Sequence, residues 1–395
     1  MAAVANLAEE LRTLLGAECV GEREGKPLVS PRTTEEVAAV ARYADEHKVA
    51  VEITGAGTKR GWGNPVAADL LLDTTRLTGV REHSASDLTA TVAAGTPWDA
   101  MQGVLAVHGQ RVALDPLWPA TATVGGVIAT NDSGAWRLRY GSLRDLIIGM
   151  TIVLADGTIA KSGGKVVKNV AGYDLHKLMT GAFGTLGIIT EVTFRLHPLP
   201  KHTQTFTIAA PQATQFAPLM RAIQNSHLLT QGVQIRCNGE GAHLDIELDA
   251  HPSAAHADLL REMTHAAGFE LSDCGEQAAN LWGTRETLFR DGATVIKLSV
   301  LPTELCETLV AMQNASDVSI RCVAQASGLI FAALEGAPAA IESYLQSLKA
   351  DVAILASTNA QRWKAEPSAL PLMREIKRQF DPNRVLNPGR FVGGI

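Results

Sequence analysis

Hydrophobic and polar residues in the first part of the chain follow two periods, one helical and one extended. From Thr33 to Lys48, apolar residues recur every three or four positions behind a capping box formed by Thr33 and Glu36, which predicts a helix. Runs rich in β-branched and aliphatic residues predict strands at 49–54, 70–73 and 89–94. This part of the chain is therefore expected to mix helices and strands.

Turn and cap residues set the bounds of the next elements. Thr96 followed by Pro97 predicts a helix that Thr96 caps and Gly109 ends. Asp156-Gly157 has the composition of a tight turn, so residues 151–160 are predicted to form a hairpin.

A change of rhythm separates the two halves of the chain. A long strand predicted at 187–196 is followed by HPLPKH at 197–202, which breaks both periods and predicts a linker. Beyond it, the order strand, helix, strand, strand, helix, strand occurs over 204–273 and again over 293–357, with a helix predicted near 276–290 between them. We infer a duplicated βαββαβ unit. Its consecutive strands are close enough in sequence to pair as hairpins, so the sheet is expected to be mixed or antiparallel.

Composition and charge exclude several classes of protein. With 46% hydrophobic and 19% charged residues in a chain of 395, long disordered tails are not expected, and the length favours two or three domains. The net charge of −6 provides no basic field for nucleic acid. The longest apolar run, 146–155, is about half a membrane span, and Glu9 and Glu10 stand where a signal peptide would be basic and then apolar. We therefore expect a cytoplasmic protein without a transmembrane segment.

The spacing of cysteines and histidines favours no metal centre. The 5 cysteines form no CxxC pair, which excludes a zinc ribbon or a self-ligated iron–sulfur cluster and suits buried thiols in a reducing compartment. None of the 11 histidines has the helical spacing of a zinc site, and no GxSxG string supports acyl transfer.

Glycine clusters are the first indication of function, because glycine lets a backbone approach a ligand closely. A strand precedes Gly55-x-Gly57, but a dinucleotide fingerprint also needs a helix directly after its glycines. Gly61, Gly63 and Pro65 oppose such a helix here. The pattern favours a loop that folds around a phosphate with successive N–H groups, to which Lys59 and Arg60 would add charge. The alternative is a glycine-rich surface loop.

Three further segments strengthen the ligand interpretation. The segment 118–134 combines small residues with the hydroxyls of Thr121, Thr123, Thr130 and Ser133, so that a flat ring or a diphosphate could lie against its backbone. GAFGTLG at 181–187 leads into a strand, and 165–178 joins Lys165, Lys168 and Asn169 to a Gly172-Tyr173-Asp174 turn. So many loops exceed what turns alone require.

The order and the amino-acid sequences of these loops resemble those of the PCMH-type FAD-binding domain in the vanillyl-alcohol-oxidase flavoprotein superfamily. The resemblance runs from about Pro31 to Pro200 and returns at 380–391. It implies an α+β fold with FAD as cofactor. The implied parts are an FAD-binding domain at 1–200, a cap domain with a mixed or antiparallel sheet at 201–360, and a C-terminal segment at 361–395 that returns to the FAD-binding domain.

The resemblance also assigns residues to the cofactor. The first loop is implied to hold the pyrophosphate through Thr54, Gly55, Ala56, Gly57, Thr58 and Lys59. The second segment is implied to line the cofactor through Thr121, Thr123, Val124, Gly125, Gly126, Asn131, Ser133 and Gly134. Contacts from the following strand are implied for Gly184, Gly187 and Ile189, with Asn387 near the flavin ring.

Departures from the superfamily narrow the expected function. Thr58 stands where some members attach the flavin to a histidine, so we expect non-covalent FAD. Phe183 replaces an acid found in the 2-hydroxyacid dehydrogenases, and their metal-binding HxGDGN motif is absent, since CNGEGAHLD at 237–245 lacks its spacing. The pattern is similar to the family of FAD-binding E subunits of bacterial glycolate oxidases, better called glycolate dehydrogenases. Those subunits work beside a larger flavoprotein and an iron–sulfur subunit.

The resemblance therefore implies an FAD-dependent oxidoreductase that acts on CH–OH donors. Its complex would oxidise glycolate to glyoxylate and pass electrons from flavin to the iron–sulfur subunit, at the inner face of the cytoplasmic membrane if the partners hold it there. Two alternatives stay open: a self-sufficient FAD oxidoreductase for another 2-hydroxyacid or alcohol, and a non-catalytic structural subunit.

No catalytic residue follows from the sequence, but Arg285 and Lys297 are weak candidates. Both lie in the predicted cap, and Lys297 is a cation in an apolar strand. Such cations suit a substrate carboxylate. An ordinary salt bridge or a side chain that reaches solvent at a sheet edge is the favoured alternative for each.

Overall fold

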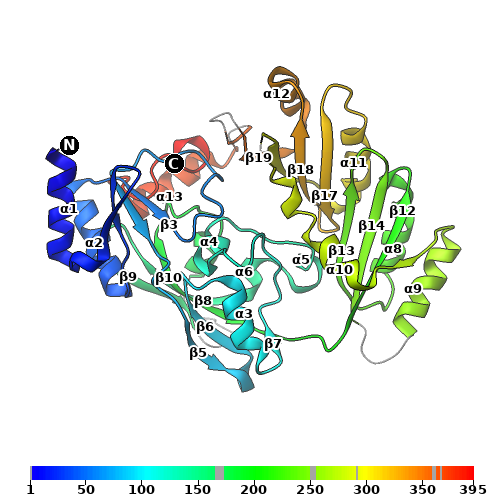
Figure 1. Cartoon of the computed structure of the whole chain (residues 1–395), viewed down its shortest axis with the longest axis horizontal. Helices are drawn as coiled ribbons and strands as arrows, with labels where there is room; N and C mark the ends of the chain where they lie inside the picture. Colours follow the sequence, from blue (N-terminus) through cyan, green and yellow to red (C-terminus); the bar gives the residue numbers. More distant parts are fainter. Residues whose placement is uncertain (1, 165–172, 250–254, 291, 358–361, 365–366) are drawn as a thin grey trace. The chain divides into compact units, whose positions relative to one another are not determined.

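The computed structural model describes residues 2–164, 173–249, 255–290, 292–357, 362–364 and 367–395 (Figure 1). The chain forms two compact units. The first comprises Met1–Ser133, Ser142–Leu199 and Glu366–Ile395, and the second comprises Gly134–Gly141 and Pro200–Ala365. The division after Leu199 lies inside the predicted linker. The predicted glycine and lysine cluster at 165–172 lies outside the described residues.

The first unit begins with a small mixed sheet. Its strands, in the spatial order β1-β2-β4-β3, are β1 (Val20–Arg23), β2 (Lys26–Val29), β4 (Leu70–Asp73) and β3 (Val51–Thr54). β1 and β2 form an antiparallel hairpin, whereas β4 runs parallel to both β2 and β3. α1 (Ala2–Leu15) and α2 (Thr34–His47) pack on this sheet through one apolar core.

The predicted helix from Thr33 to Lys48 is confirmed as α2, with a shifted capping box, whereas α1 was not predicted. Thr33 caps α2, and its hydroxyl accepts a hydrogen bond from the Glu36 N–H at 3.1 Å. The Glu36 carboxylate accepts from the Arg32 N–H at 2.6 Å, one residue earlier than a reciprocal box requires. The bond from the Glu36 N–H satisfies a group that a helix start leaves without an intrahelical partner, and the bond from Arg32 fixes the chain just before the cap.

A second, antiparallel sheet completes the first unit. Its strands, in the order β5-β6-β10-β8-β9, are β5 (Val80–Ser84), β6 (Thr89–Ala93), β10 (Ile188–Arg195), β8 (Ile147–Val153) and β9 (Ile159–Gly163). The helices between and after them are α3 (Trp98–Ala106), α4 (Val124–Ala129), α6 (Leu143–Leu146), α7 (Leu175–Met179) and α13 (Leu370–Phe380). A short pair links β7 (Gln110–Arg111) to β11 (His197–Pro198). The predicted hairpin is present as β8 and β9, with Gly157 at a φ of 81° in its turn.

The predicted bounds of α3 are wrong at both ends. Pro97 has an extended conformation and is itself the N-cap, because the Thr96 hydroxyl donates to Ala93 O at 2.7 Å instead of capping the helix. The helix ends at Ala106, before Gly109.

The second unit is an eight-stranded antiparallel sheet that confirms the duplicated pattern. The first copy contains β12 (Thr203–Ala210), α8 (Ala217–Gln224), β13 (Thr230–Cys237), β14 (Ala242–Asp249), α9 (Ala255–Ala266) and β15 (Ser272–Asp273). The second contains β16 (Thr294–Ser299), α11 (Leu305–Gln313), β17 (Ser319–Gln325), β18 (Leu329–Glu335), α12 (Pro338–Ser347) and β19 (Asp351–Ala356). The spatial order is β15-β12-β14-β13-β17-β18-β16-β19, so the copies join through their second strands.

Two short helices complete the second unit. α5 (Arg137–Tyr140) belongs to it and contacts β13, although the prediction placed this segment in the FAD-binding domain. Between the copies, α10 (Ala278–Gly283) is flanked by 3-10 turns at Gly275–Gln277 and Glu286–Leu288 instead of forming one continuous helix. Among the described helices, none has both the length and the apolar character that crossing a bilayer requires.

Candidate cofactor-binding site

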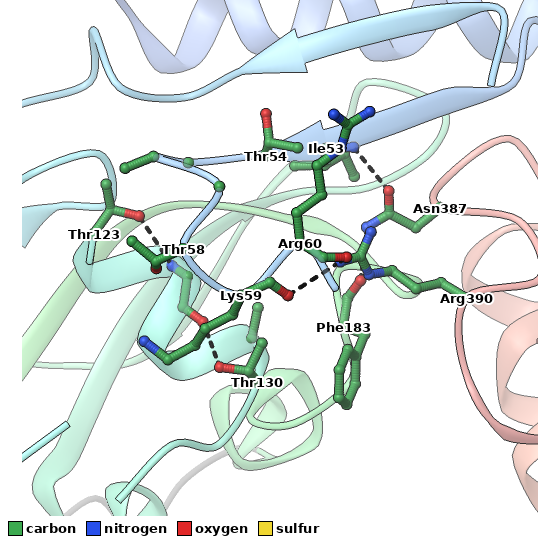
Figure 2. A pocket seen from close by; sticks show the side chains of 15 residues that line it. Ile53, Thr54, Thr58, Lys59, Arg60, Thr123, Thr130, Phe183, Asn387 and Arg390 are labelled. Carbon is green, nitrogen blue, oxygen red and sulfur yellow. Dashed lines mark hydrogen bonds between the residues drawn. The ribbon is translucent and has the colours of Figure 1, made fainter. Parts of the chain in front are cut away.

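A pocket of the first unit opens where the glycine-rich loop leaves β3 (Figure 2). Its wall comes from four parts of the unit: the loop at 53–60, α4 with its flanking threonines, Phe183 of the GAFG turn, and the C-terminal segment. No helix follows Gly55-x-Gly57, because the chain runs through turns until β4 begins. The sequence argument against a Rossmann fingerprint is therefore confirmed.

The loop presents a row of backbone donors. Within the described part of the chain, no group accepts the N–H of Gly55, Ala56, Gly57 or Thr58. Gly57 has a φ of 77°, and a Cβ built on it would meet nothing within 4 Å. The buried Thr54 Oγ1 likewise has no partner among the described residues. Successive N–H groups and a hydroxyl form a nest that fits an anion such as a diphosphate.

The second glycine of interest serves the packing of the loop. A Cβ on Gly55 would lie 2.1 Å from Thr123 Oγ1. Thr123 caps α4, since its hydroxyl accepts from the Gly126 N–H at 3.3 Å. Gly55 is therefore required for the loop to approach α4, whatever the loop binds.

The side chain of Lys59 is directed into the protein. Its ammonium lies 3.2 Å from Asp132 Oδ2 and donates to Leu117 O at 3.1 Å. The side chain is only 3% exposed, and the ring centroids of Trp62 and Trp118 lie 5.7 and 5.3 Å from Nζ. The Lys59 ammonium, which was expected to add positive charge near a pyrophosphate, is thus paired with a buried carboxylate.

The two arginines of the pocket are also matched with carboxylates. Arg60 donates to both oxygens of Glu52, at 2.7 and 2.8 Å, and also to Glu24. Hydrogen bonds to Glu52 and Glu24 raise the pKa of Arg60 above its ordinary value, so it stays charged. Arg390 donates to Arg60 O at 2.8 Å and lies 3.5 Å from Glu52 Oε1. Burial lowers the pKa of Arg390, which Glu52 opposes. The described cations of the pocket are therefore each balanced, and the loop's donors remain for an anion.

Asn387 closes the pocket from the C-terminal segment (Figure 2). Its side-chain oxygen accepts from the Ile53 N–H at 2.8 Å, and its Nδ2 donates to Phe183 O at 2.6 Å. Its own N–H donates to Val51 O at 2.9 Å. Asn387 thereby ties β3 to the GAFG turn.

A buried ion pair places Asn387. Lys377 Nζ lies 2.5 Å from Asp381 Oδ2 and also donates to Thr185 O and Leu386 O. The Asp381 carboxylate accepts from the N–H groups of Val385 and Leu386, at 2.9 and 2.8 Å. Burial lowers the pKa of Lys377, and the Asp381 charge opposes this shift. The DPNRVLNPGRF string is thus a folded return segment.

The structure brings many, but not all, of the predicted cofactor residues to this pocket. Those that line it are Thr54, Gly55, Ala56, Gly57, Thr58, Lys59, Thr123, Gly126 and Asn387. Those outside its lining are Thr121, Val124, Gly125, Asn131, Ser133, Gly134, Gly184, Gly187 and Ile189. Of these, Val124 and Ile189 are in the apolar core of the second sheet, and Gly134 belongs to the other unit. Arg390 was not singled out from the sequence, where its only signal is its place after Asn387-Pro-Gly.

The two weak catalytic candidates converge in the second unit. The Arg285 guanidinium lies 5.1 Å and the Lys297 ammonium 5.7 Å from the ring centroid of Phe331. Lys297 on β16 is directly opposite Phe331 on β18. Ile296 precedes Lys297 on β16, and Ile330 precedes Phe331 on β18. Both isoleucines belong to the apolar core, so by alternation Lys297 and Phe331 face the other side of the sheet.

Comparisons with known proteins agree with this site. Residues 26–163 match the FAD binding domain family, and residues 356–391 match the C-terminal domain of FAD linked oxidases. Both matches are to FAD-linked families, and the chain has their PCMH-type FAD-binding fold. FAD is its cofactor, which the N–H nest and the buried hydroxyl of Thr54 fit.

Relatives extend over nearly the whole chain. A D-lactate dehydrogenase of Archaeoglobus fulgidus is 27% identical, covering 92% of this chain and 91% of the relative. A D-2-hydroxyglutarate dehydrogenase of Xanthomonas citri pv. viticola is 28% identical over 91% of this chain and 88% of the relative. The glycolate oxidase subunit GlcD of Bacillus subtilis is 37% identical over 45% of this chain and 38% of the relative. The comparisons thus extend beyond glycolate enzymes.

Solved structures share the fold. p-Cresol methylhydroxylase with bound substrate aligns with a TM-score of 0.74 at 16% identity, covering 99% of this chain and 97% of the other. A 4-ethylphenol oxidase from Gulosibacter chungangensis aligns with a TM-score of 0.75 at 15% identity, covering 98% and 96%. The predicted α+β class and PCMH-type FAD-binding fold are confirmed.

Proposed function

We propose that this protein is the FAD-binding subunit of a glycolate dehydrogenase complex that oxidises glycolate to glyoxylate. The observation that carries the proposal is the pair Arg285 and Lys297 around one aromatic ring, in a chain whose cofactor is FAD. A guanidinium fork matches a carboxylate, and a second cation beside it favours a small acid over a neutral alcohol.

The roles of the chain's residues in such a reaction are binding and orientation. Arg285 and Lys297 hold the substrate carboxylate, which fixes the carbon that carries the hydroxyl. The loop after β3 fixes the cofactor through its N–H groups. FAD held by that loop would supply the hydride acceptor for the oxidation. The hydroxyl proton needs a base, and we assign none to the described residues of this chain.

The proposed electron path leads out of the chain. The 5 cysteines form no CxxC pair, and Cys19, Cys237, Cys306 and Cys322 are buried as free thiols. Among the described residues, no group of three or more histidines, cysteines and carboxylates is placed to hold a metal ion, whereas an iron–sulfur relay needs clustered thiolates. We therefore propose the larger flavoprotein and the iron–sulfur subunit as partners, and through them a place in the cytoplasm at the inner face of the membrane.

We also propose that FAD is held without a covalent bond, because Thr58 lines the pocket where some members of the superfamily attach the flavin to a histidine. Acid precipitation of the purified protein should release all flavin into the supernatant. Flavin that stays on the washed pellet contradicts this proposal.

A second candidate is a self-sufficient dehydrogenase for another 2-hydroxyacid. The near full-length match to proteins named D-lactate and D-2-hydroxyglutarate dehydrogenase favours it. Phe183 and the missing HxGDGN motif favour the subunit proposal instead.

The deciding experiment is dye-linked oxidation of glycolate, D-lactate and D-2-hydroxyglutarate by the purified chain and by the chain co-expressed with its two proposed partners. The subunit proposal expects glycolate turnover only in the complex. Equal turnover by the chain alone supports the self-sufficient enzyme, and a purified chain that carries no flavin supports the structural subunit.

A further inference from the structure

The Lys59–Asp132 pair lies directly beneath the loop that binds the pyrophosphate, yet it is closed off from solvent. The two side chains are 3% and 0% exposed. The Asp132 Oδ2 that faces Lys59 also accepts from the Leu117 N–H at 2.7 Å. Lys59 in turn donates to Leu117 O. One carboxylate and one ammonium thus hold both backbone groups of the same residue.

This pair joins two cofactor-binding segments. Lys59 directly follows the N–H nest, whereas Asp132 follows α4, whose residues line the opposite wall of the pocket. The Asp132 N–H donates to Val127 O, which fixes the carboxylate to the end of α4. Trp62, which follows Lys59, and Trp118, which precedes α4, both lie beside the ammonium. The loop is therefore attached to α4 at two points. At Lys59 it is held by the ion pair, and at Gly55 it is held by close packing against Thr123.

We propose that Lys59 is a positioning residue for FAD. It holds the loop in the conformation in which the backbone N–H groups converge on the diphosphate, while its own ammonium does not contact the diphosphate. For the ammonium to reach a diphosphate it would have to break its ion pair with the buried Asp132, which is more costly than the new contact is favourable. This inference depends on FAD in the pocket and on no particular substrate.

The test is a double-mutant cycle read by FAD affinity. The variants are Lys59→Met, which keeps the length of the side chain, Asp132→Asn, and the two together, each stripped of flavin and titrated with FAD by fluorescence quenching. If Lys59 is a positioning residue, both single variants should bind FAD about tenfold or more weakly, because each breaks the buried ion pair by removing one of its charges. The double variant should recover at least about threefold relative to Lys59→Met.

If the Lys59 ammonium instead contacts the diphosphate directly, the opposite results are expected. Asp132→Asn would then free the ammonium and tighten FAD binding, and the double variant would bind no better than Lys59→Met. Either result overturns the proposal. If Lys59→Met alone does not fold, Asp132→Asn and the double variant, which leaves no unpaired charge, still decide between the two.

Salt provides a second readout that a general loss of stability does not move. A lysine on a phosphate makes the FAD dissociation constant depend on ionic strength, whereas a buried clamp does not. We expect wild type and the double variant to show the same slope between about 50 and about 500 mM salt, and a flatter slope in the variant contradicts positioning. Arg236→Met is the matched control, because Arg236 pairs with the buried Asp245 in the other unit at 2.6 Å. It should lower stability and leave FAD affinity unchanged.

Discussion

The pocket of the first unit and the cation pair of the second arrange charge in opposite ways. In the pocket, Arg60 lies against Glu52, and Lys59 against Asp132, so backbone N–H groups are what the site presents. In the second unit, Arg285 and Lys297 both lie against the ring of Phe331. Backbone donors bind an anion whatever the side chains are, whereas a site of side-chain cations depends on each residue. Substitutions should therefore affect the two regions differently.

The largest effect is expected where a charge is added to the backbone site. Gly57→Asp places a carboxylate beside the diphosphate, and two charges about 4 Å apart at an effective dielectric of about 20 repel by about 4 kcal/mol. FAD affinity should fall about a thousandfold, so the purified variant should be colourless. Gly57→Asn is the matched control, because asparagine tolerates a positive φ and adds no charge. A yellow Gly57→Asp variant would remove the loop from the site.

Removing the clamp that closes the pocket should weaken the first unit next most. Asn387→Ala leaves the Ile53 N–H and Phe183 O buried without their side-chain partner, at about 1–3 kcal/mol each. We expect the free energy of unfolding of the first unit to fall by about 3 kcal/mol, measured by urea denaturation. Asn383→Ala, in the same segment, removes only an exposed bond to Asp45 and should cost far less. Equal losses in the two variants would contradict the role of Asn387.

The side-chain site should respond in substrate binding without loss of flavin. Arg285→Met removes one charged partner of the proposed carboxylate, about 1.5–3 kcal/mol, so KM should rise about tenfold to a hundredfold while FAD content stays normal. Steady-state kinetics of the complex measure this. Arg321→Met is the control, since Arg321 pairs with the partly exposed Glu335 on the same sheet. An unchanged KM in Arg285→Met refutes the carboxylate assignment.

The smallest effect is expected from a change of pH, which titrates side chains but not backbone N–H groups. The acid sensitivity of the first unit's stability should therefore come from side chains such as His176. Burial lowers the pKa of His176. Below the ordinary histidine pKa of about 6.5 the unfolded chain gains a proton that the folded chain resists. Stability should therefore fall as pH drops from neutral through the folded pKa, by at most about 1.4 kcal/mol per pH unit for this group. His176→Gln should flatten that part of the profile, and an identical profile would exclude His176.

The sequence predicted elements whose signals are local. The cap of α2, the strand β4 and the repeated unit of the second half all rest on neighbouring residues, and each is present. The end of α3 differs because Pro97 takes the capping position that Thr96 was expected to fill. Local patterns fix element types well, and end residues less well.

The site was less predictable where partners are far apart in the chain. Glycine spacing and the family resemblance indicated the loop after β3. They did not reveal that Lys59 faces Asp132, since both residues suit a surface equally well. The convergence of Arg285 and Lys297 on Phe331 depends on the register of β16 against β18, which no local pattern specifies.

The clamp at Asn387 also has a consequence for biosynthesis. Asn387 is separated from Ile53 by 334 positions, so at about 5–20 residues per second the ribosome delivers it about 17 to 67 seconds after β3 has emerged. During that interval the whole second unit is made, while β3 waits without the neighbour that completes its edge. A transcript cut between β10 and the return segment would yield a chain with the strands of both sheets of the first unit and an open cofactor pocket. Such chains would be early targets for chaperones and proteases.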